Sequence, residues 1–553
     1  MTLMKKPYAI VLCFAGLQLA GQAFCQAPKE SAERWFREGA ERAHSLGSDK
    51  AKAKNVILFV GDGMSLPTVA AARIYEGQLR KQTGEENQLS FEKFPYTAFS
   101  KTYNTDSQTP DSAGTMTAMI TGAKTRIGFL SVDQSLARGD CPAGLKSPLT
   151  SAVTLAKAAG LSTGVVTTTR ITHATPGATY AHTTERNWES DADMPDKAKS
   201  QGCKDIAQQL VAYATGTGVD VLMGGGLNKF LPPSAVGYPN TKGERKDGRD
   251  LIADWKSRQP ATTFVNTGSQ LKQLDLAKTG RLVGLFNGDH LNYEYDRVND
   301  KEDEPSLAEM TKAAINLLNK NGKGFFLVVE GGRIDHAHHS GNAFRALTDT
   351  VAFSEAIRAA NELTSAEDTL ILVTADHSHT MSFVGYPQRG NPILGKVFGK
   401  SSEDDPISLV KDLLGKPFTT LVYANGPGYS GESSLQPAGT KNFPHNPGGY
   451  FEPANGRPDL SDIDTEHPNF MQEALVPSNS ESHGGDDVGI WARGPGSEAV
   501  RGNLEQNVIF HLITQPQPLI QQWLCAKGYC ENGVASKLPR WAPIGLINRS
   551  HIY

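Results

Sequence analysis

Cysteine is scarce in this sequence, with six residues among 553, and none of the six forms a Cys-x-x-Cys pair. Their spacing argues against zinc sites built from thiolates. Long runs of lysine and arginine are also absent, and the formal net charge is -4. A protein whose main partner is nucleic acid normally carries a concentrated basic surface, so no nucleic-acid partner is expected.

Nucleotide-binding motifs are missing as well. The run Gly224-Gly225-Gly226 lacks both the Lys-Ser/Thr ending of a P-loop and the spaced glycines of a dinucleotide fingerprint. Internal repeats are absent, and a content of 39% hydrophobic and 21% charged residues is typical of a globular protein. A chain of this length holds roughly three domains by the usual relation, or one large α/β sheet with insertions.

The N-terminal apolar stretch is too short for a transmembrane helix. Lys5 and Lys6 precede apolar residues 8–20, and a segment of small residues ends near Cys25. This pattern is typical of a secretory signal peptide over residues 1–25, which predicts a periplasmic or secreted mature protein without a transmembrane segment. A lipid modification of Cys25 stays open.

Four cysteines remain beyond that segment, which is an even number in an oxidising compartment and predicts two disulfides. Three pairings are possible. Proximity along the chain favours Cys141 with Cys203 and Cys525 with Cys530.

Five potential metal ligands follow one apolar stretch. Residues 325–329 are apolar, β-branched at their end and followed closely by two glycines, so they are predicted to form a buried strand. Ligands bind at the carboxyl edge of open α/β sheets, and carboxylates and imidazoles are donors that zinc and magnesium prefer. The alternative is a solvated loop rich in acids and histidines. The five candidates are Glu330, Asp335, His336, His338 and His339.

Other strand-like segments end in similar donors. Their repeated order of strand, donor-bearing loop and helix predicts an α/β fold with a large, mostly parallel central sheet flanked by helices and with its sites along one edge. The alternative for Gly61-Asp62-Gly63 is a common turn. The candidates are Asp62 after residues 55–60, His173 and Thr175 after residues 164–170, and Asp376 and His377 after residues 370–375.

A segment of small residues from Ser112 onward is predicted to form a helix after Pro110 and Asp111. Helix N-termini favour anions, so a phosphoryl group attached to Ser112 would be stabilised there. The alternative is that Asp111 and Ser112 only cap the helix. Arg186 is a candidate phosphate clamp because a guanidinium can hold two phosphate oxygens, although a lone arginine is more often a surface residue.

Residues 386–475 are rich in glycine, proline, serine and asparagine, which predicts a loop-rich inserted subdomain. The main α/β domain would then comprise residues 26–385 and 476–553. Beyond the insertion, His483 is the last candidate ligand.

Together these motifs resemble the alkaline phosphatase family in order and approximate spacing over residues 55–530. The resemblance implies a phosphomonoester hydrolase with an alkaline optimum, which acts on small phosphomonoesters through a phosphoserine intermediate. It also implies a homodimer in which the inserted subdomain forms a crown. The motifs are Val60-Gly61-Asp62-Gly63-Met64, Pro110-Asp111-Ser112-Ala113-Gly114-Thr115, His173-Ala174-Thr175-Pro176, residues 330–339, Ala375-Asp376-His377 and Ser482-His483-Gly484-Gly485.

The same resemblance implies a role for each candidate residue. One zinc ion would be held by Asp335, His339 and His483, and a second by Asp62, Asp376 and His377 beside the Ser112 oxygen. A magnesium ion would lie with Asp62, Thr175 and Glu330, and His173 would stand behind it. Ser112 would be the nucleophile, Arg186 the phosphate clamp and His336 a residue that orders water near the phosphate. The resemblance also supports the disulfides Cys141 to Cys203 and Cys525 to Cys530, and His173 and His336 are typical of the animal-type branch.

The sequence departs from that branch at its calcium site. Asn287 stands where an acidic residue is expected and Glu304 replaces a second acid, so the resemblance does not extend to calcium. Zinc, cobalt and magnesium share the donors of the other sites, so metal identity rests on the family alone.

Two other classes of protein would share the donors at the strand ends. A sulfatase or phosphodiesterase is one of them, but the Cys/Ser-x-Pro-x-Arg motif of sulfatases is absent around Ser112. A non-catalytic periplasmic protein that binds phosphate or metal is the other. Ser112 and Arg186 together favour the enzyme.

Overall fold

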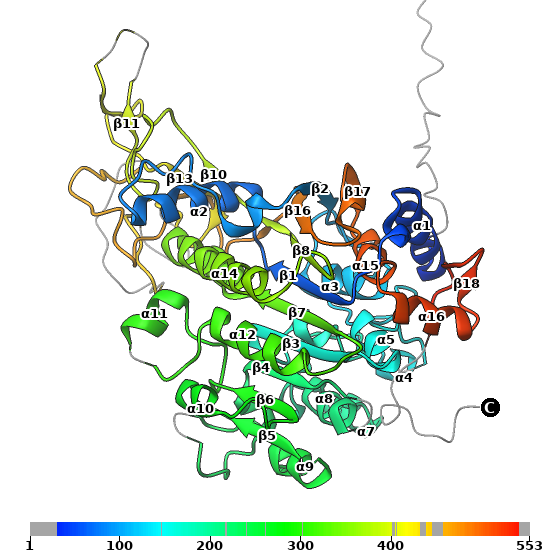
Figure 1. Cartoon of the computed structure of the whole chain (residues 1–553). Helices are drawn as coiled ribbons and strands as arrows, with labels where there is room; N and C mark the ends of the chain where they lie inside the picture. Colours follow the sequence, from blue (N-terminus) through cyan, green and yellow to red (C-terminus); the bar gives the residue numbers. More distant parts are fainter. Residues whose placement is uncertain are drawn as a thin grey trace, which may run out of the picture.

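A ten-stranded sheet forms the centre of the molecule, with strands in the order β17-β2-β16-β8-β1-β7-β3-β4-β6-β5 (Figure 1). The structure is a computed structural model that describes residues 30–144, 146–215, 218–238, 241–259, 261–300, 302–400, 404, 406–431, 438–444 and 457–540. The predicted signal peptide, residues 1–25, lies outside these ranges. None of the helices within them has the length and apolar composition that a membrane crossing requires.

The strands from β8 to β5 in that order are all parallel, and β16 runs antiparallel to both β8 and β2. The prediction of a mostly parallel sheet is therefore confirmed. The strands are β1 (Asn55–Gly61), β2 (Tyr96–Lys101), β3 (Ser162–Arg170), β4 (Val221–Gly225), β5 (Thr262–Val265), β6 (Arg281–Leu285), β7 (Phe325–Gly331), β8 (Thr369–Ala375), β16 (Val488–Arg493) and β17 (Asn503–Glu505).

Strand β1 shows how the sequence builds the layers around the sheet. Every residue of β1 is buried, and successive side chains of a strand point to opposite faces. Leu58 accordingly joins one hydrophobic cluster, whereas Ile57 and Phe59 join the other. The sequence of a parallel strand that is covered on both faces is therefore a continuous apolar run.

Helices cover both faces of the sheet (Figure 1). One face packs against α2 (Leu66–Leu79), α12 (Leu307–Leu318) and α14 (Ala343–Leu363). The other packs against α1 (Ala32–Ser45), α3 (Ser112–Thr121), α5 (Ala152–Ala158), α8 (Ile206–Thr215), α15 (Val508–Thr514) and α16 (Pro518–Ala526).

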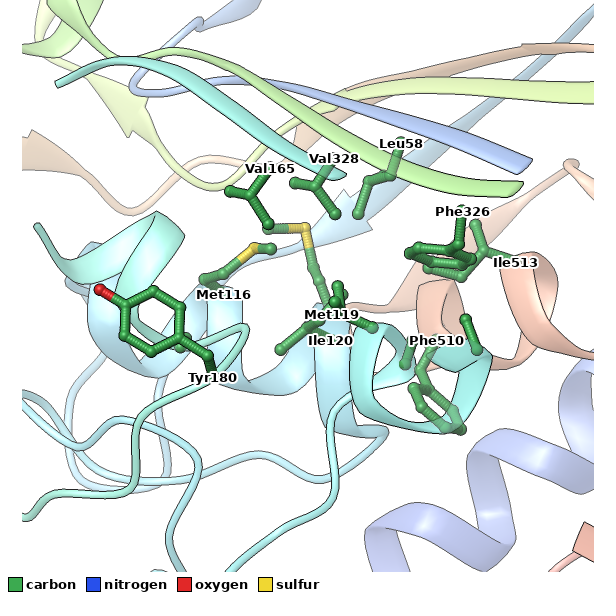
Figure 2. Packing of buried hydrophobic residues seen from close by; sticks show 14 of the residues in the cluster. Leu58, Met116, Met119, Ile120, Val165, Tyr180, Phe326, Val328, Phe510 and Ile513 are labelled. Atoms are coloured by element: carbon green, nitrogen blue, oxygen red, sulfur yellow. The ribbon is translucent and has the colours of Figure 1, made fainter. Parts of the chain in front are cut away.

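Helix α3 is fixed at both ends. The side chain of Asp111 caps its N-terminus, and Gly122 ends it with a φ of 79°, a left-handed conformation that favours glycine. Between these ends Met116 and Met119 point toward Val165 and Val328 of the sheet (Figure 2). Ser112, the first residue of the helix, is therefore held in a defined position.

Smaller sheets lie in and around the predicted insertion, residues 386–475. One contains β10 (Met381–Phe383), β13 (Leu421–Gly426) and β14 (Ala474–Pro477), and another pairs β11 (Phe398–Gly399) with β12 (Ser408–Leu409). Figure 1 shows these strands outside the main sheet. The chain also contains the disulfides Cys141–Cys203 and Cys525–Cys530, the two pairs expected from the sequence.

Candidate active site

Three acidic side chains meet at the carboxyl ends of adjacent parallel strands. Asp62 follows β1, Asp376 follows β8 and Glu330 lies near the end of β7. The register pairs Val60 with Glu330 and Gly61 with Ala375, which brings the three carboxylates together as the sequence predicts. Burial and the neighbouring carboxylate of Asp376 raise the pKa of Asp62 well above its ordinary value. Such a group of buried like charges favours the binding of cations.

Asp335 and His339 lie on a short helix, α13 (Arg333–His339), rather than on a loop. Residues four apart share one face of a helix. Oδ1 of Asp335 lies 3.4 Å from Nε2 of His339 and 3.3 Å from Nε2 of His483, which begins β15 (His483–Gly484). Burial alone would raise the pKa of Asp335, but the surrounding imidazoles hold it well below its ordinary value.

The three histidines that the resemblance assigns to zinc, His339, His377 and His483, each use Nδ1 in a contact with a main-chain carbonyl. Nδ1 of His339 lies 2.5 Å from the carbonyl oxygen of Glu481, Nδ1 of His483 lies 2.7 Å from that of Pro110, and Nδ1 of His377 lies 3.2 Å from that of the next residue. Because a carbonyl can only accept, Nδ1 carries the proton and Nε2 keeps its lone pair. This is the tautomer that a metal ligand needs.

Asp62 and Glu330 belong to a further group of buried donors, together with His173. Oδ2 of Asp62, Oγ1 of Thr175 and Oε1 of Glu330 have no hydrogen-bond partner among the described residues. Burial raises the pKa of Glu330 to about 7 even though the Thr167 hydroxyl donates to its other oxygen. Unpaired buried oxygens are costly unless something satisfies them. A hard cation such as magnesium fits these residues because it takes oxygen ligands.

Ser112 faces the candidate ligands at the ends of β8 and β1. Its hydroxyl oxygen lies 3.2 Å from Nε2 of His377 and 3.5 Å from Oδ1 of Asp62. Ser112 is only 2% exposed, and it stands at the N-terminus of α3, whose free N–H groups and dipole favour an anion. The hydroxyl is therefore placed between a candidate metal site and a site for negative charge.

The guanidinium of Arg186 is fixed beside the N-terminus of α3. Its Nη1 donates to Oδ2 of Asp111 at 3.0 Å, and its Nη2 lies 3.2 Å from Nε2 of His173. Oδ2 of Asp111 also accepts from the main-chain N–H of Gly128 at 2.9 Å. Asp111 directly precedes Ser112, so its hydrogen bond to Arg186 fixes the guanidinium close to Ser112. His173 contacts Arg186 as well as standing near the magnesium donor set.

His336 is held by a second arginine. Nη1 of Arg333 lies 2.9 Å from Nδ1 of His336, which makes Nδ1 an acceptor and leaves the proton on Nε2. Burial and the charge of Arg333 lower the pKa of His336 well below its ordinary value, so the ring is neutral. The ring of His290 packs against it with centroids 4.2 Å apart.

Comparisons with known proteins identify the family. The family model for alkaline phosphatase matches residues 53–517. The alkaline phosphatase of Gadus morhua is 42% identical over 488 residues, which cover 87% of this chain and 95% of that protein. The tissue-nonspecific isozyme of Homo sapiens is 42% identical over 501 residues, which cover 88% of each. The chain belongs to the alkaline phosphatase family.

Solved alkaline phosphatases share the fold. The enzyme from Thermus thermophilus has 25% sequence identity and a TM-score of 0.58, and the match covers 86% of this chain and 96% of that one. The enzyme from the Antarctic bacterium TAB5 has 22% identity and a TM-score of 0.54, over 85% and 98% of the two chains. The protein is accordingly a phosphomonoesterase of a metal-dependent family, and its described residues contain clusters able to bind metal.

The sequence did not indicate three residues that the structure places in or beside this site. His379 follows His377 by two positions, so proximity to a motif was the available signal. Glu481 is buried beside the candidate ligands, and only its position before His483 pointed to it. Nothing in the sequence around His290 indicated its contact with His336.

The segment where animal-type alkaline phosphatases carry calcium is held here by amide hydrogen bonds. Asn287 Nδ2 donates to Oε1 of Glu304 at 2.5 Å, and the main-chain N–H of Asn292 donates to Oε2 at 2.9 Å. Glu304 is buried, and burial raises its pKa. Since Asn287 turns an amide N–H₂ group toward Glu304 and does not supply a second carboxylate, these residues do not fit a calcium ion.

Calcium is therefore expected to leave the thermal stability of the zinc- and magnesium-loaded protein unchanged. A ligand bound only by the folded state adds about 2.7 kcal/mol at 100 times its Kd, which calorimetry detects as a shift in Tm. Calorimetry with and without calcium provides the measurement. The variant Asn287→Asp replaces the amide donor by a second carboxylate, and its Tm is expected to rise when calcium is added. A calcium-dependent rise in the Tm of the parental protein would show that these residues do bind calcium.

Proposed function

We propose that this alkaline phosphatase hydrolyses phosphomonoesters by two displacements through a phosphoserine at Ser112. In the first, the Ser112 oxygen forms a bond to phosphorus while the bond from phosphorus to the leaving alcohol breaks. In the second, water attacks phosphorus, the bond to Ser112 breaks and inorganic phosphate leaves. The observation that carries the proposal is the position of the Ser112 hydroxyl, 3.2 Å from Nε2 of His377 at the N-terminus of α3. Trapping of phosphate on the protein tests it.

Two zinc ions and one magnesium ion per chain are the proposed cofactors. The free Nε2 atoms and unpaired oxygens described above support this set, and elemental analysis of the purified protein measures it. When bound, such ions stabilise a deprotonated nucleophile, the leaving oxygen and the charge of the transferring group. The proposed ligands are Asp335, His339 and His483 for one zinc, Asp62, Asp376 and His377 for the other, and Asp62, Thr175 and Glu330 for magnesium.

The protein itself supplies binding, orientation and proton placement. Arg186 would hold two equatorial phosphate oxygens, where negative charge accumulates during the transfer. The main-chain N–H groups at the start of α3 would also donate hydrogen bonds to the phosphate oxygens. His336, with its proton on Nε2, would order water beside the phosphate. Proton loss from Ser112 and from the attacking water accompanies the two displacements.

Activity is expected to rise from neutral toward alkaline pH. Burial lowers the pKa of His339 and His377, so these ligands are neutral before the pH rises. The remaining requirement is deprotonation of Ser112 and of water, which higher pH favours. The pH profile of kcat/KM, measured with the metal-saturated enzyme, tests this expectation. A maximum in acid would count against it.

Replacement of Arg186 by alanine is expected to raise KM for phosphomonoesters and to weaken inhibition by inorganic phosphate, each roughly 10- to 100-fold. A charge-assisted hydrogen bond contributes about 1.5–3 kcal/mol, which corresponds to that range. Arg186→Lys keeps the charge but cannot form two parallel hydrogen bonds to phosphate. Its KM and its phosphate Ki should lie between those of the parental protein and those of Arg186→Ala. Arg80→Ala, which removes the arginine that follows the last residue of α2, serves as the control. An unchanged phosphate Ki in Arg186→Ala would remove Arg186 from the phosphate site.

A homodimer and export from the cytoplasm complete the proposal. Leu66 and Phe99 are 38% and 48% exposed, and they line a hollow beside Trp491. Apolar surface of this kind is typical of an interface. Phe99→Glu is therefore expected to shift the protein from dimer to monomer in sedimentation analysis.

Two disulfides are consistent with a periplasmic or secreted protein, and cell fractionation tests that location.

A further inference from the structure

A buried chain of hydrogen bonds extends from Glu481 to one candidate zinc ligand. Glu481 is 1% exposed, and its Oε2 lies 2.5 Å from Nδ1 of His379. The opposite ring nitrogen, Nε2 of His379, lies 2.7 Å from Oδ1 of Asp335. Because carboxylates accept, His379 donates from both nitrogens and has no lone pair left for a metal. His379 therefore bridges two carboxylates and does not act as a ligand.

The main chain of Glu481 reaches a second candidate ligand. Its carbonyl oxygen lies 2.5 Å from Nδ1 of His339, and its N–H donates to the carbonyl of His339 at 2.9 Å. One residue thus contacts His339 through its backbone and Asp335 through His379. These two ligands come from α13, whereas Glu481 lies far along the chain, beyond the predicted insertion.

The surroundings of Glu481 and His379 leave little freedom to either side chain. Oε1 of Glu481 accepts from the main-chain N–H of Thr380 at 2.7 Å and from its hydroxyl at 2.5 Å. The ring of His338 stacks on His379 with centroids 4.8 Å apart, and Nδ1 of His338 lies 2.8 Å from the hydroxyl oxygen of Tyr423. A Cβ atom at Gly63 would lie 2.3 Å from the His379 ring, so only glycine fits there.

We propose that Glu481 is a positioning residue for the zinc site of Asp335, His339 and His483, and that it sets the affinity of this site for its metal. The inference rests on the proposed function, because it assumes that these residues bind zinc. A carboxylate that orients a ligand through hydrogen bonds typically changes metal affinity by about 10- to 100-fold when it is removed. Glu481→Gln keeps the size of the side chain but presents an amide N–H₂ or a neutral oxygen to His379.

Competition with a chromophoric chelator is the experiment that tests this. In Glu481→Gln, the affinity for one zinc ion per chain is expected to fall roughly 10- to 100-fold, while the other stays at its parental value. Cadmium-113 substitution identifies the weakened site by NMR, since one site has two imidazole ligands and the other has one. Glu76→Gln alters another buried carboxylate, which contacts Asn87 and Arg80 away from the metal ligands, and is the matched control.

A second variant covers the case in which Glu481→Gln fails to fold. Thr380→Val removes only the hydroxyl that holds Oε1 of Glu481, and a several-fold loss of zinc affinity at the same site is expected. Folded variants that keep both zinc ions at parental affinity would overturn the role of Glu481. Absence of tight zinc binding in the parental protein would instead overturn the proposed function, so the two failures are distinguishable.

Discussion

Replacement of Ser112 by alanine is expected to abolish turnover of phosphomonoesters, with a loss in kcat on the order of 10⁴-fold or more. The hydroxyl is the one oxygen of α3 placed 3.2 Å from Nε2 of His377 and 3.5 Å from Oδ1 of Asp62. Alanine removes it without disturbing the cap, because the helix is capped by the Asp111 side chain. Steady-state hydrolysis of a chromogenic monoester provides the measurement.

The same variant is expected to lose covalent labelling by phosphate. Acid quenching stops the reaction and preserves a phosphoserine, so parental protein incubated with labelled inorganic phosphate should retain label on the peptide that contains Ser112. Ser200→Ala, which removes an exposed hydroxyl bonded only to a nearby carbonyl, is the control and should label as the parental protein does. Undiminished labelling of a folded, metal-loaded Ser112→Ala variant would refute the nucleophile.

The fold was predictable where burial dictates the pattern. Strand β1 is covered on both faces, so its apolar run stands out in the sequence, and the same holds for β7 and β8. Strand β2 was not predicted, because it lies near the edge of the sheet and its side chains Tyr96 and Phe99 are exposed. Edge strands carry no continuous apolar run that could distinguish them from loops.

The candidate ligands were predictable because parallel strands deliver their carboxyl ends to one edge. That rule alone was sufficient to predict that Asp62 and Asp376 lie close together. The local geometry of Asp335 and His339 was not predictable, since a helix of seven residues carries too little periodicity to read. Contacts such as that of Glu481 with His379 join positions 102 residues apart, and no local pattern encodes them.

Removal of the divalent metals is expected to abolish activity and to lower Tm by several degrees. Four buried carboxylates, those of Asp62, Glu330, Asp335 and Asp376, would lose the cations that balance their charges. A ligand present at 1,000 times its Kd adds about 4.1 kcal/mol to stability, so loss of several ions is a large effect. Chelation followed by activity assay and calorimetry provides the measurement, and zinc with magnesium should restore both properties. A metal-free protein with full activity would exclude the proposed cofactors.

The stability lost on metal removal is expected to grow as the pH rises. Burial raises the pKa of Glu330 from its ordinary value of 4.5 to about 7, and it shifts Asp62 in the same direction. A carboxyl group whose folded-state pKa is raised contributes stability that is present below its unfolded-state pKa and is lost as the pH passes the folded-state pKa. Tm of the metal-free protein should therefore fall between about pH 4.5 and about pH 7, while bound cations relieve this cost in the loaded protein. The difference in Tm between the two forms should widen across that interval, and a difference that narrows would contradict the assignment of these carboxylates to metal.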